Sequence, residues 1–297
     1  MQSSKVNIVF FGTGRFACPS IEMLHKYHNL LAVVTSPNPC PAKEVAHKLG
    51  IKILEPINPN IDEFVNLLKT LSPDMIALAD YGHILKKEIL DIPKLVSINI
   101  HPSLLPAYRG AAPIRWVIMN NKKWAGVTTF IMDEQIDHGD ILLQEKVEIL
   151  LSDTYGSLES RLSKVGASLL INTISQFNEL KPKPQPSEGV TYAPKITKEM
   201  RKIDWNKSVI EIVNLIRALS PEPAAYTTFR GKRVEILKAS YLWWHGELGK
   251  ISECKPRLLV GASNGCVELE LLKPEGKREQ SALDFVNGYN PQIGESM

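Results

Sequence analysis

The sequence predicts an α/β fold: a doubly wound, mostly parallel Rossmann-like sheet followed by a small OB-like β-barrel domain. Through the first 180 residues, apolar runs rich in β-branched residues alternate with helical patterns, as in parallel sheets covered by helices on both faces. After residue 208, short β-like runs follow one another between turn residues, which is typical of small barrels. We therefore expect a first domain over residues 1–180, a basic proline-containing linker over 181–208 and a barrel domain over 209–297.

The elements of the first domain follow from the spacing of its apolar residues. The predicted strands, where apolar residues run together, lie at 5–11, 30–35, 51–54, 75–79, 96–101, 126–132 and 141–149. The predicted helices, where apolar residues recur at helical spacing, lie at 16–26, 41–49, 61–71, 112–120 and 154–180. Gly12 and Gly14, after the first strand, fit a phosphate-binding turn or, more commonly, a tight β-to-α turn.

The second domain opens with a predicted helix at 209–218. Its β-like runs lie at 225–229, 233–237, 258–260 and 266–272, separated by turn residues such as Gly231 and Asn264-Gly265. Trp243 and Trp244 follow the second run. Exposed aromatic rings can stack nucleic-acid bases in OB folds, but packing beneath the barrel is the commoner use, and we expect it here.

Composition favours a protein of the cytoplasm. The 297 residues are 44% hydrophobic, which suffices for one large core or two moderate ones. The four cysteines form no C-x-x-C pair, so we expect neither a redox motif nor a metal site. No apolar run approaches the ~20 residues of a membrane helix, and the amino-terminal run is too short for a signal peptide. We expect no membrane partner.

The net charge of +3 is concentrated in the predicted linker. Residues 181–208 hold three acidic residues against seven basic ones: Lys181, Lys183, Lys195, Lys198, Arg201, Lys202 and Lys207. A short basic stretch is more often a solvated linker than a phosphate contact, and the charge alone does not choose between them.

Two polar side chains leave the same face of the predicted strand 96–101 at its end. Successive side chains of a strand alternate between faces, so Asn99 and His101 project together, and Pro102 then stops the strand. The carboxyl ends of strands in open α/β sheets are where ligands bind. Taken singly, each residue is more often a local hydrogen-bonding group, but together they are candidate functional residues.

Longer motifs around this pair favour a functional role. Residues 99–106 (NIHPSLLP), 108–114 (YRGAAPI) and 137–140 (DHGD) together resemble the signature of the folate-dependent formyltransferases. Residues 217–226 (RALSPEPAAY) and 269–288 resemble the second domain of the branch that acts on methionyl-tRNA, so the resemblance covers nearly the whole chain.

The resemblance implies transfer of a formyl group from 10-formyltetrahydrofolate to the amino group of methionyl-initiator tRNA, for translation initiation. The alternative is a sugar-nucleotide N-formyltransferase that uses the same folate donor. Under either interpretation the first domain is catalytic and needs no metal. We expect a monomer.

The implied catalytic residues are Asn99, His101 and Asp140. An amide such as that of Asn99 can donate to the oxyanion of a tetrahedral intermediate, His101 can take the proton of the amine, and Asp140 can orient the imidazole. The implied folate-binding segment is Ser103, Leu104, Leu105 and Pro106.

One departure from the family concerns the nucleic acid. The tRNA-acting branch usually carries a loop rich in Arg, Lys and Gly after the second strand, whereas here residues 35–40 (TSPNPC) run directly into the next helix. The missing loop favours the sugar-nucleotide alternative, while the matching second domain disfavours it. If tRNA binds, we expect the linker residues Lys198, Arg201 and Lys202 to contact its phosphates.

Overall fold

The computed structural model describes residues 5–297, which form two compact units. The first unit comprises the residues up to Pro113 together with Trp124–Glu148 and Glu159–Ala193. The second comprises Ile114–Lys123, Ile149–Leu158 and Pro194–Met297. The segment 181–208 is thereby divided: residues 181–193 pack with the first unit and residues 194–208 with the second.

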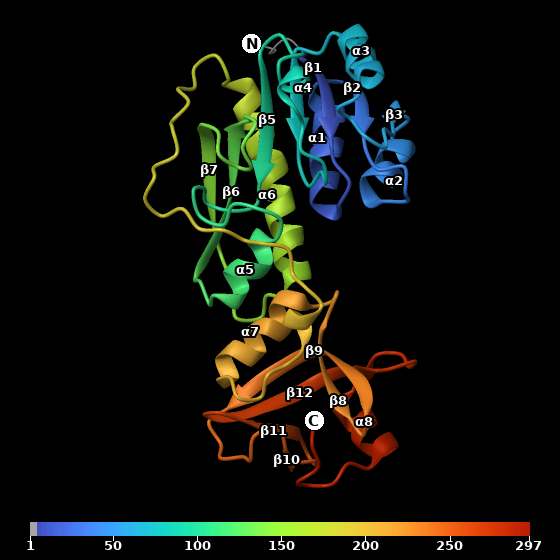
Figure 1. Ribbon diagram of the computed structural model, residues 1–297, viewed down its shortest axis with the longest axis vertical. Helices are drawn as coiled ribbons and strands as arrows, with labels where there is room; N and C mark the ends of the chain where they lie inside the picture. Colours follow the sequence, from blue (N-terminus) through green and yellow to red (C-terminus); the bar gives the residue numbers. More distant parts are fainter. Residues whose placement is uncertain (1–4) are drawn as a thin grey trace. The chain divides into compact units, whose positions relative to one another are not determined.

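A seven-stranded sheet forms the centre of the first unit, in the order β3-β2-β1-β4-β5-β6-β7 (Figure 1). Its strands are β1 (Asn7–Phe11), β2 (Asn29–Val34), β3 (Ile53–Leu54), β4 (Met75–Leu78), β5 (Val96–His101), β6 (Trp124–Ile131) and β7 (Ile141–Glu148). The first five are parallel, whereas β6 runs antiparallel to β5, and β7 to β6. The prediction of a doubly wound, mostly parallel sheet is confirmed.

Helices cover both faces of this sheet. The helices of this unit are η1 (Arg15–Ala17), α1 (Cys18–Tyr27), α2 (Pro41–Lys48), α3 (Asp62–Leu71), α4 (Lys87–Leu90) and most of α6 (Tyr155–Ser175). Helix α5 (Pro113–Met119) falls largely in the second unit. Residues of α3 and α4 share a core with one face of β1 and β4. On α6, Gly166 packs closely against β5 and η1: a Cβ at this position would lie 3.0 Å from the Ile100 side chain and 3.3 Å from that of Phe16.

The second unit is built on an antiparallel sheet with strand order β10-β11-β12-β9-β8, and β13 pairs with β12. Its strands are β8 (Ala225–Phe229), β9 (Lys232–Leu242), β10 (Ile251–Glu253), β11 (Leu258–Ala262), β12 (Gly265–Pro274) and β13 (Gln280–Ser281). Helix α7 (Val209–Leu219) begins with a capping box formed by Ser208 and Glu211, which satisfies backbone donors at its first turn. Helix α8 (Ala282–Tyr289) buries Phe285 in the same core.

Helices α4 and α8 and strands β10 and β13 were not predicted, and one predicted helix is shorter than expected. The helix predicted over 154–180 ends at Ser175, and residues 176–180 form turns in which Glu179 N–H donates to the carbonyl of Gln176. Helix α8 was not predicted, since eight residues with two buried side chains give little periodic signal.

The aromatic residues after β9 do not pack beneath the sheet. Trp243 is 66% exposed and Trp244 58% exposed, and the Tyr241 ring meets that of Trp243 edge-on at 5.4 Å. The expectation that these rings fill the barrel interior is therefore wrong.

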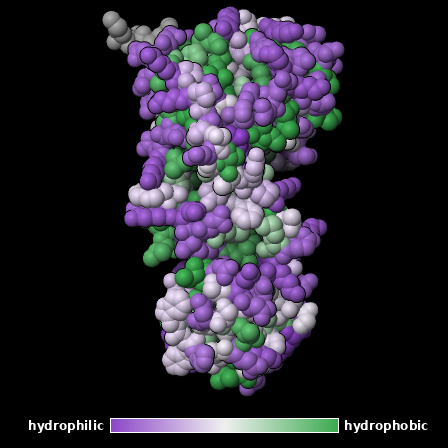
Figure 2. Space-filling model, turned by 60° about the vertical axis from the view of Figure 1, so that its left-hand side comes forward, coloured by the Kyte–Doolittle hydropathy of each residue, from purple (hydrophilic) through white to green (hydrophobic). Residues whose placement is uncertain are grey.

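Among residues 5–297, no helix is both long and apolar enough to cross a membrane. Hydrophilic side chains predominate on the molecular face shown in Figure 2.

Candidate active site

The site begins where β5 ends, beside two other strand ends. Asn99 pairs with Leu78 of β4 on one side and with Phe130 of β6 on the other. Asn99 is half-buried, and within residues 5–297 its carboxamide makes no hydrogen bond. The amide therefore has free donors at the position the sequence predicts.

His101 is buried, and each of its ring nitrogens lies near an oxygen atom of a following loop. Its Nε2 lies 2.9 Å from the carbonyl oxygen of Tyr108, and its Nδ1 lies 3.6 Å from Oδ1 of Asp137. A carbonyl can only accept, so in the neutral ring Nε2 carries the hydrogen and Nδ1 keeps the lone pair. A proton taken up by this imidazole would bind at Nδ1, facing a carboxylate.

Asp137 is the carboxylate that the structure places beside His101. It is 9% exposed, and its Oδ2 accepts a hydrogen bond of 2.7 Å from the backbone N–H of Gly110. Asp140 is half-buried, and its backbone carbonyl accepts from Ile131 N–H at the start of the β6–β7 pairing.

Both aspartates belong to the DHGD motif, and the sequence did not separate them. In the structure the backbone of Asp140 is tied into the sheet beside β7, whereas Asp137, three positions earlier, is buried beside His101. The role predicted for Asp140 stays a prediction.

The segment Ser103–Pro106 is a turn whose polar groups are largely used by the protein itself. The hydroxyl of Thr128 donates to the carbonyl of Ser103 (2.7 Å) and accepts from Leu105 N–H (3.2 Å). The side-chain amide of Gln144 donates to the carbonyl of Leu105 and to the same Thr128 hydroxyl. Two strands, β6 and β7, thus fix the turn that follows His101.

A second carboxylate lies at the reversal of strand order between β1 and β4. Asp80 follows β4 with a left-handed backbone (φ 52°), and its carboxylate lies directly over Gly14, where any side chain would overlap it. Asp80 stays in contact with solvent, but the protein atoms around its carboxylate, and secondarily the charge of Glu159, raise its pKa to about 6. A side chain at position 14 would therefore require the Asp80 carboxylate to move.

The three basic residues proposed for nucleic-acid contact differ in their surroundings. The Arg201 guanidinium donates to the carbonyls of Pro223 and Ala224 and lies 3.5 Å from Glu235, so it holds the second unit together. Lys198 and Lys202 are exposed. Arg201 is half-buried, so of the three residues only the two lysines are freely exposed.

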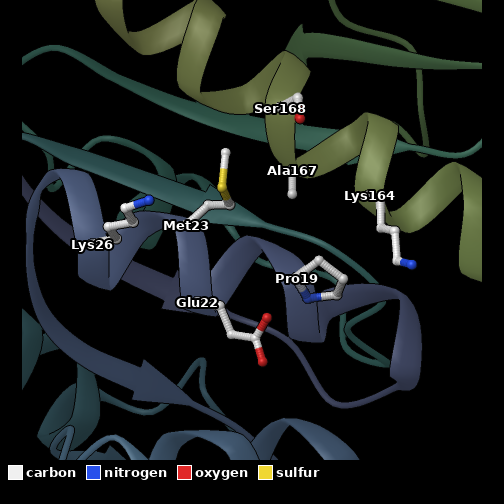
Figure 3. A pocket seen from close by; sticks show the side chains of 7 residues that line it. All are labelled: Pro19, Glu22, Met23, Lys26, Lys164, Ala167 and Ser168. Atoms are coloured by element: carbon white, nitrogen blue, oxygen red, sulfur yellow. The ribbon is translucent and has the colours of Figure 1, made fainter.

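A cavity of about 350 Å³ lies elsewhere in the first unit, between α1 and α6 (Figure 3). It is lined by Pro19, Glu22, Met23, Lys26, Lys164, Ala167 and Ser168. None of these residues belongs to the strand-end cluster, so we place the active site at β5 and not in this cavity. Across residues 5–297, no group of three or more His, Cys, Asp or Glu side chains is arranged to hold a metal ion.

Comparison with known proteins identifies the family of the chain. Residues 6–174 match the model of the formyl transferase family, and residues 195–290 match that of the formyl transferase C-terminal domain. The chain therefore belongs to the formyl transferase family.

Its relatives define the branch. The methionyl-tRNA formyltransferase of Thermodesulfovibrio yellowstonii is 41% identical, with 98% of this chain and 97% of that protein covered. That of Caldanaerobacter subterraneus subsp. tengcongensis is 40% identical, over 96% and 97%. WlaRD, a sugar 3N-formyl transferase of known structure, superposes with a TM-score of 0.69 at 22% identity over 93% of this chain and 100% of its own, a likeness of fold alone.

Thr128→Val should destabilise the protein by about 1–3 kcal/mol, because it leaves buried groups of the Ser103–Pro106 turn unpaired. The free energy of unfolding from urea titration measures the loss. Thr128→Ser keeps the hydroxyl and is the matched control. Equal losses in the two variants would show that the hydroxyl does not hold the turn.

Asp80→Asn should stabilise the protein at pH 8 and have little effect at pH 4. Because the folded-state pKa is raised to about 6, the folded protein binds the proton more tightly than the unfolded chain, so stability falls as pH rises from about 4 through 6. Asparagine has no charge to desolvate. Melting temperatures across this range test the prediction, with the exposed Glu188→Gln as control, and a pH-independent difference for Asp80→Asn would contradict it.

Proposed function

We propose that this chain transfers the formyl group of 10-formyltetrahydrofolate to the amino group of methionyl-initiator tRNA. The observation that carries the proposal is a buried histidine paired with a carboxylate, beside an unengaged amide on the same strand end. The family matches in both the amino-terminal and carboxyl-terminal regions agree with it. Such a reaction belongs to the cytoplasm, where initiator tRNA is charged.

The reaction assigns a step to each side chain. The amine nitrogen attacks the formyl carbon, and the carbonyl oxygen gains negative charge, which the Asn99 amide can stabilise by donating a hydrogen bond. The amine loses a proton to Nδ1 of His101. The bond between the formyl carbon and N10 then breaks, and the same proton passes to N10. The products are the formylated amine and tetrahydrofolate.

Asp137 is the residue we propose to orient His101. Its carboxylate lies where the imidazolium would carry its new proton, and a backbone N–H fixes its other oxygen. An oriented histidine loses less freedom on reaching the transition state, and its charged form is stabilised. Asp140, the other carboxylate of the motif, is the alternative.

The folate co-substrate is proposed to lie across Ser103–Pro106. WlaRD was crystallised in the presence of dTDP and 5-N-formyl-THF, so a protein of this fold has been studied with a folate. Because Thr128 and Gln144 already use the polar groups of Ser103 and Leu105, we expect this turn to recognise the donor mainly by shape.

The direct test is turnover by the purified protein with the formyl donor and one of two acceptors. We expect formylation of methionyl-initiator tRNA and not of an amino-sugar nucleotide. Turnover with the nucleotide alone would instead establish the sugar N-formyltransferase, and no turnover with either would contradict the proposal.

Replacing the proposed catalytic groups should reduce kcat without unfolding the protein. Asn99→Ala should lower kcat by about 10²–10³ and His101→Ala by about 10²–10⁴, the usual contributions of an oxyanion donor and a general base. Asp137→Asn should cost more than Asp140→Asn if Asp137 orients the histidine. Single-turnover rates measure these losses. A larger loss in Asp140→Asn than in Asp137→Asn would assign the orientation of His101 to Asp140.

Lys198→Ala combined with Lys202→Ala should weaken tRNA binding and reduce the dependence of its affinity on salt. Each lost phosphate contact should lower the slope of log affinity against log salt by roughly 0.7–0.9. We retain Arg201, because its loss would break hydrogen bonds to Pro223 and Ala224. Binding titrations at several salt concentrations test this, and an unchanged slope would rule out contacts by these lysines.

A further inference from the structure

We infer that Gln185 is a positioning residue that fixes the position of His101 relative to Asp137. It belongs to the segment Lys183–Ala193, which we call the strap. This inference rests on the proposed roles of His101 and Asp137. Gln185 lies in a proline-containing stretch whose composition predicts only a linker.

The strap is attached to the first unit at both ends. Lys183 exchanges two backbone hydrogen bonds with Ile141 at the start of β7, of 2.8 and 2.9 Å. At the other end, Arg109 N–H donates to the carbonyl of Thr191, and Ala193 N–H donates to the carbonyl of Arg109. In Figure 1 the yellow segment after α6 runs beside β7 and then crosses near the strand ends.

The Gln185 side chain joins the two loops that hold the catalytic pair. Its Oε1 accepts from Nε (3.1 Å) and Nη2 (2.6 Å) of Arg109, which is only 9% exposed. Its Nε2 donates to the carbonyls of Asp137 and Gly139, both at 2.9 Å. A guanidinium only donates and a carbonyl only accepts, so a single orientation of the amide satisfies all four bonds.

Three consecutive residues explain how the hydrogen bonds of Gln185 affect the positions of His101 and Asp137. Tyr108 offers its carbonyl to Nε2 of His101, Arg109 is held by Gln185, and Gly110 donates its N–H to Asp137. The same Gln185 holds the backbone of Asp137. A shift of either loop would therefore change the separation of Nδ1 and Oδ1, now 3.6 Å.

The backbone at these loops needs such support. Tyr108 (φ 61°) and Asp137 (φ 51°) both adopt the left-handed conformation, which is unfavourable for residues other than glycine. Their neighbours must hold them there. Gln185 secures the backbone carbonyl of Asp137, and the Thr191 hydroxyl accepts from Tyr108 N–H at 2.8 Å.

The test compares two variants of Gln185 in the full-length protein. Gln185→Leu removes all four hydrogen bonds, whereas Gln185→Glu keeps acceptors toward Arg109 but loses the donors to Asp137 and Gly139. We expect Gln185→Leu to lower kcat about 10- to 100-fold, as for other residues that orient a functional side chain, with KM for both substrates within about twofold. Gln185→Glu should fall between it and the wild type. Glu188→Gln, an exposed change in the same strap, is the control and should leave kcat unchanged.

A double-mutant cycle separates positioning from a merely structural role. If Gln185 acts through the His101–Asp137 pair, Gln185→Leu should cost less than about threefold in kcat when Asp137 is already asparagine. Full additivity would overturn the inference, as would wild-type kcat in Gln185→Leu. Should Gln185→Leu fail to fold, wild-type kcat in Gln185→Glu would overturn it instead. If Asp137→Asn alone retained wild-type turnover, the assignment of Asp137 would fail and not merely the role of Gln185.

Discussion

The active site depends on the position of the His101 imidazole between two acceptor oxygens. The Tyr108 carbonyl fixes the hydrogen on Nε2 of His101, and this leaves Nδ1, the basic nitrogen, facing the carboxylate of Asp137. Neither acceptor comes from β5 itself. The strand positions the ring, but the loops after it decide which nitrogen is basic and where a proton would be stabilised.

The other elements of the first unit hold the His101 ring and the loops around it in place. The parallel strands bring Asn99 and His101 to the sheet edge, and the antiparallel pair β6 and β7 supplies Thr128 and Gln144, which fix the turn after the histidine. The strap then ties the remaining loops together. Secondary structure alone would leave Tyr108 and Asp137 free to relax from their left-handed backbone conformations.

Much of the architecture could be predicted from the sequence, because hydrophobic periodicity is a local property. Alternation along residues 96–101 correctly placed Asn99 and His101 on one face, and the buried runs identified the parallel strands. The small antiparallel domain followed from its turns. Helix α8 was not predicted because its eight residues give a short periodic pattern. The burial of Trp243 and Trp244 was predicted wrongly because a sequence does not show which aromatic side chains pack into a core.

The candidate site was less accessible to sequence reasoning where it depends on long-range contacts. Asp137 and Asp140 are three residues apart in one motif, and only the folded loop shows which lies beside the histidine. Gln185 is 48 residues from Asp137 in the chain and lies among prolines, so no periodicity reveals it. Arg201 looked like its basic neighbours, but its hydrogen bonds to backbone carbonyls mark it as structural.

Nitrogen-15 NMR of the His101 ring tests the central claim most directly, because it reports which nitrogen carries the hydrogen in the neutral imidazole. The geometry predicts a protonated Nε2 and an unprotonated Nδ1 at alkaline pH in the wild type, and a mixture of tautomers once Gln185→Leu loosens the loop that bears Tyr108. A neutral ring with its hydrogen on Nδ1 would contradict the assignment of Nδ1 as the proton acceptor.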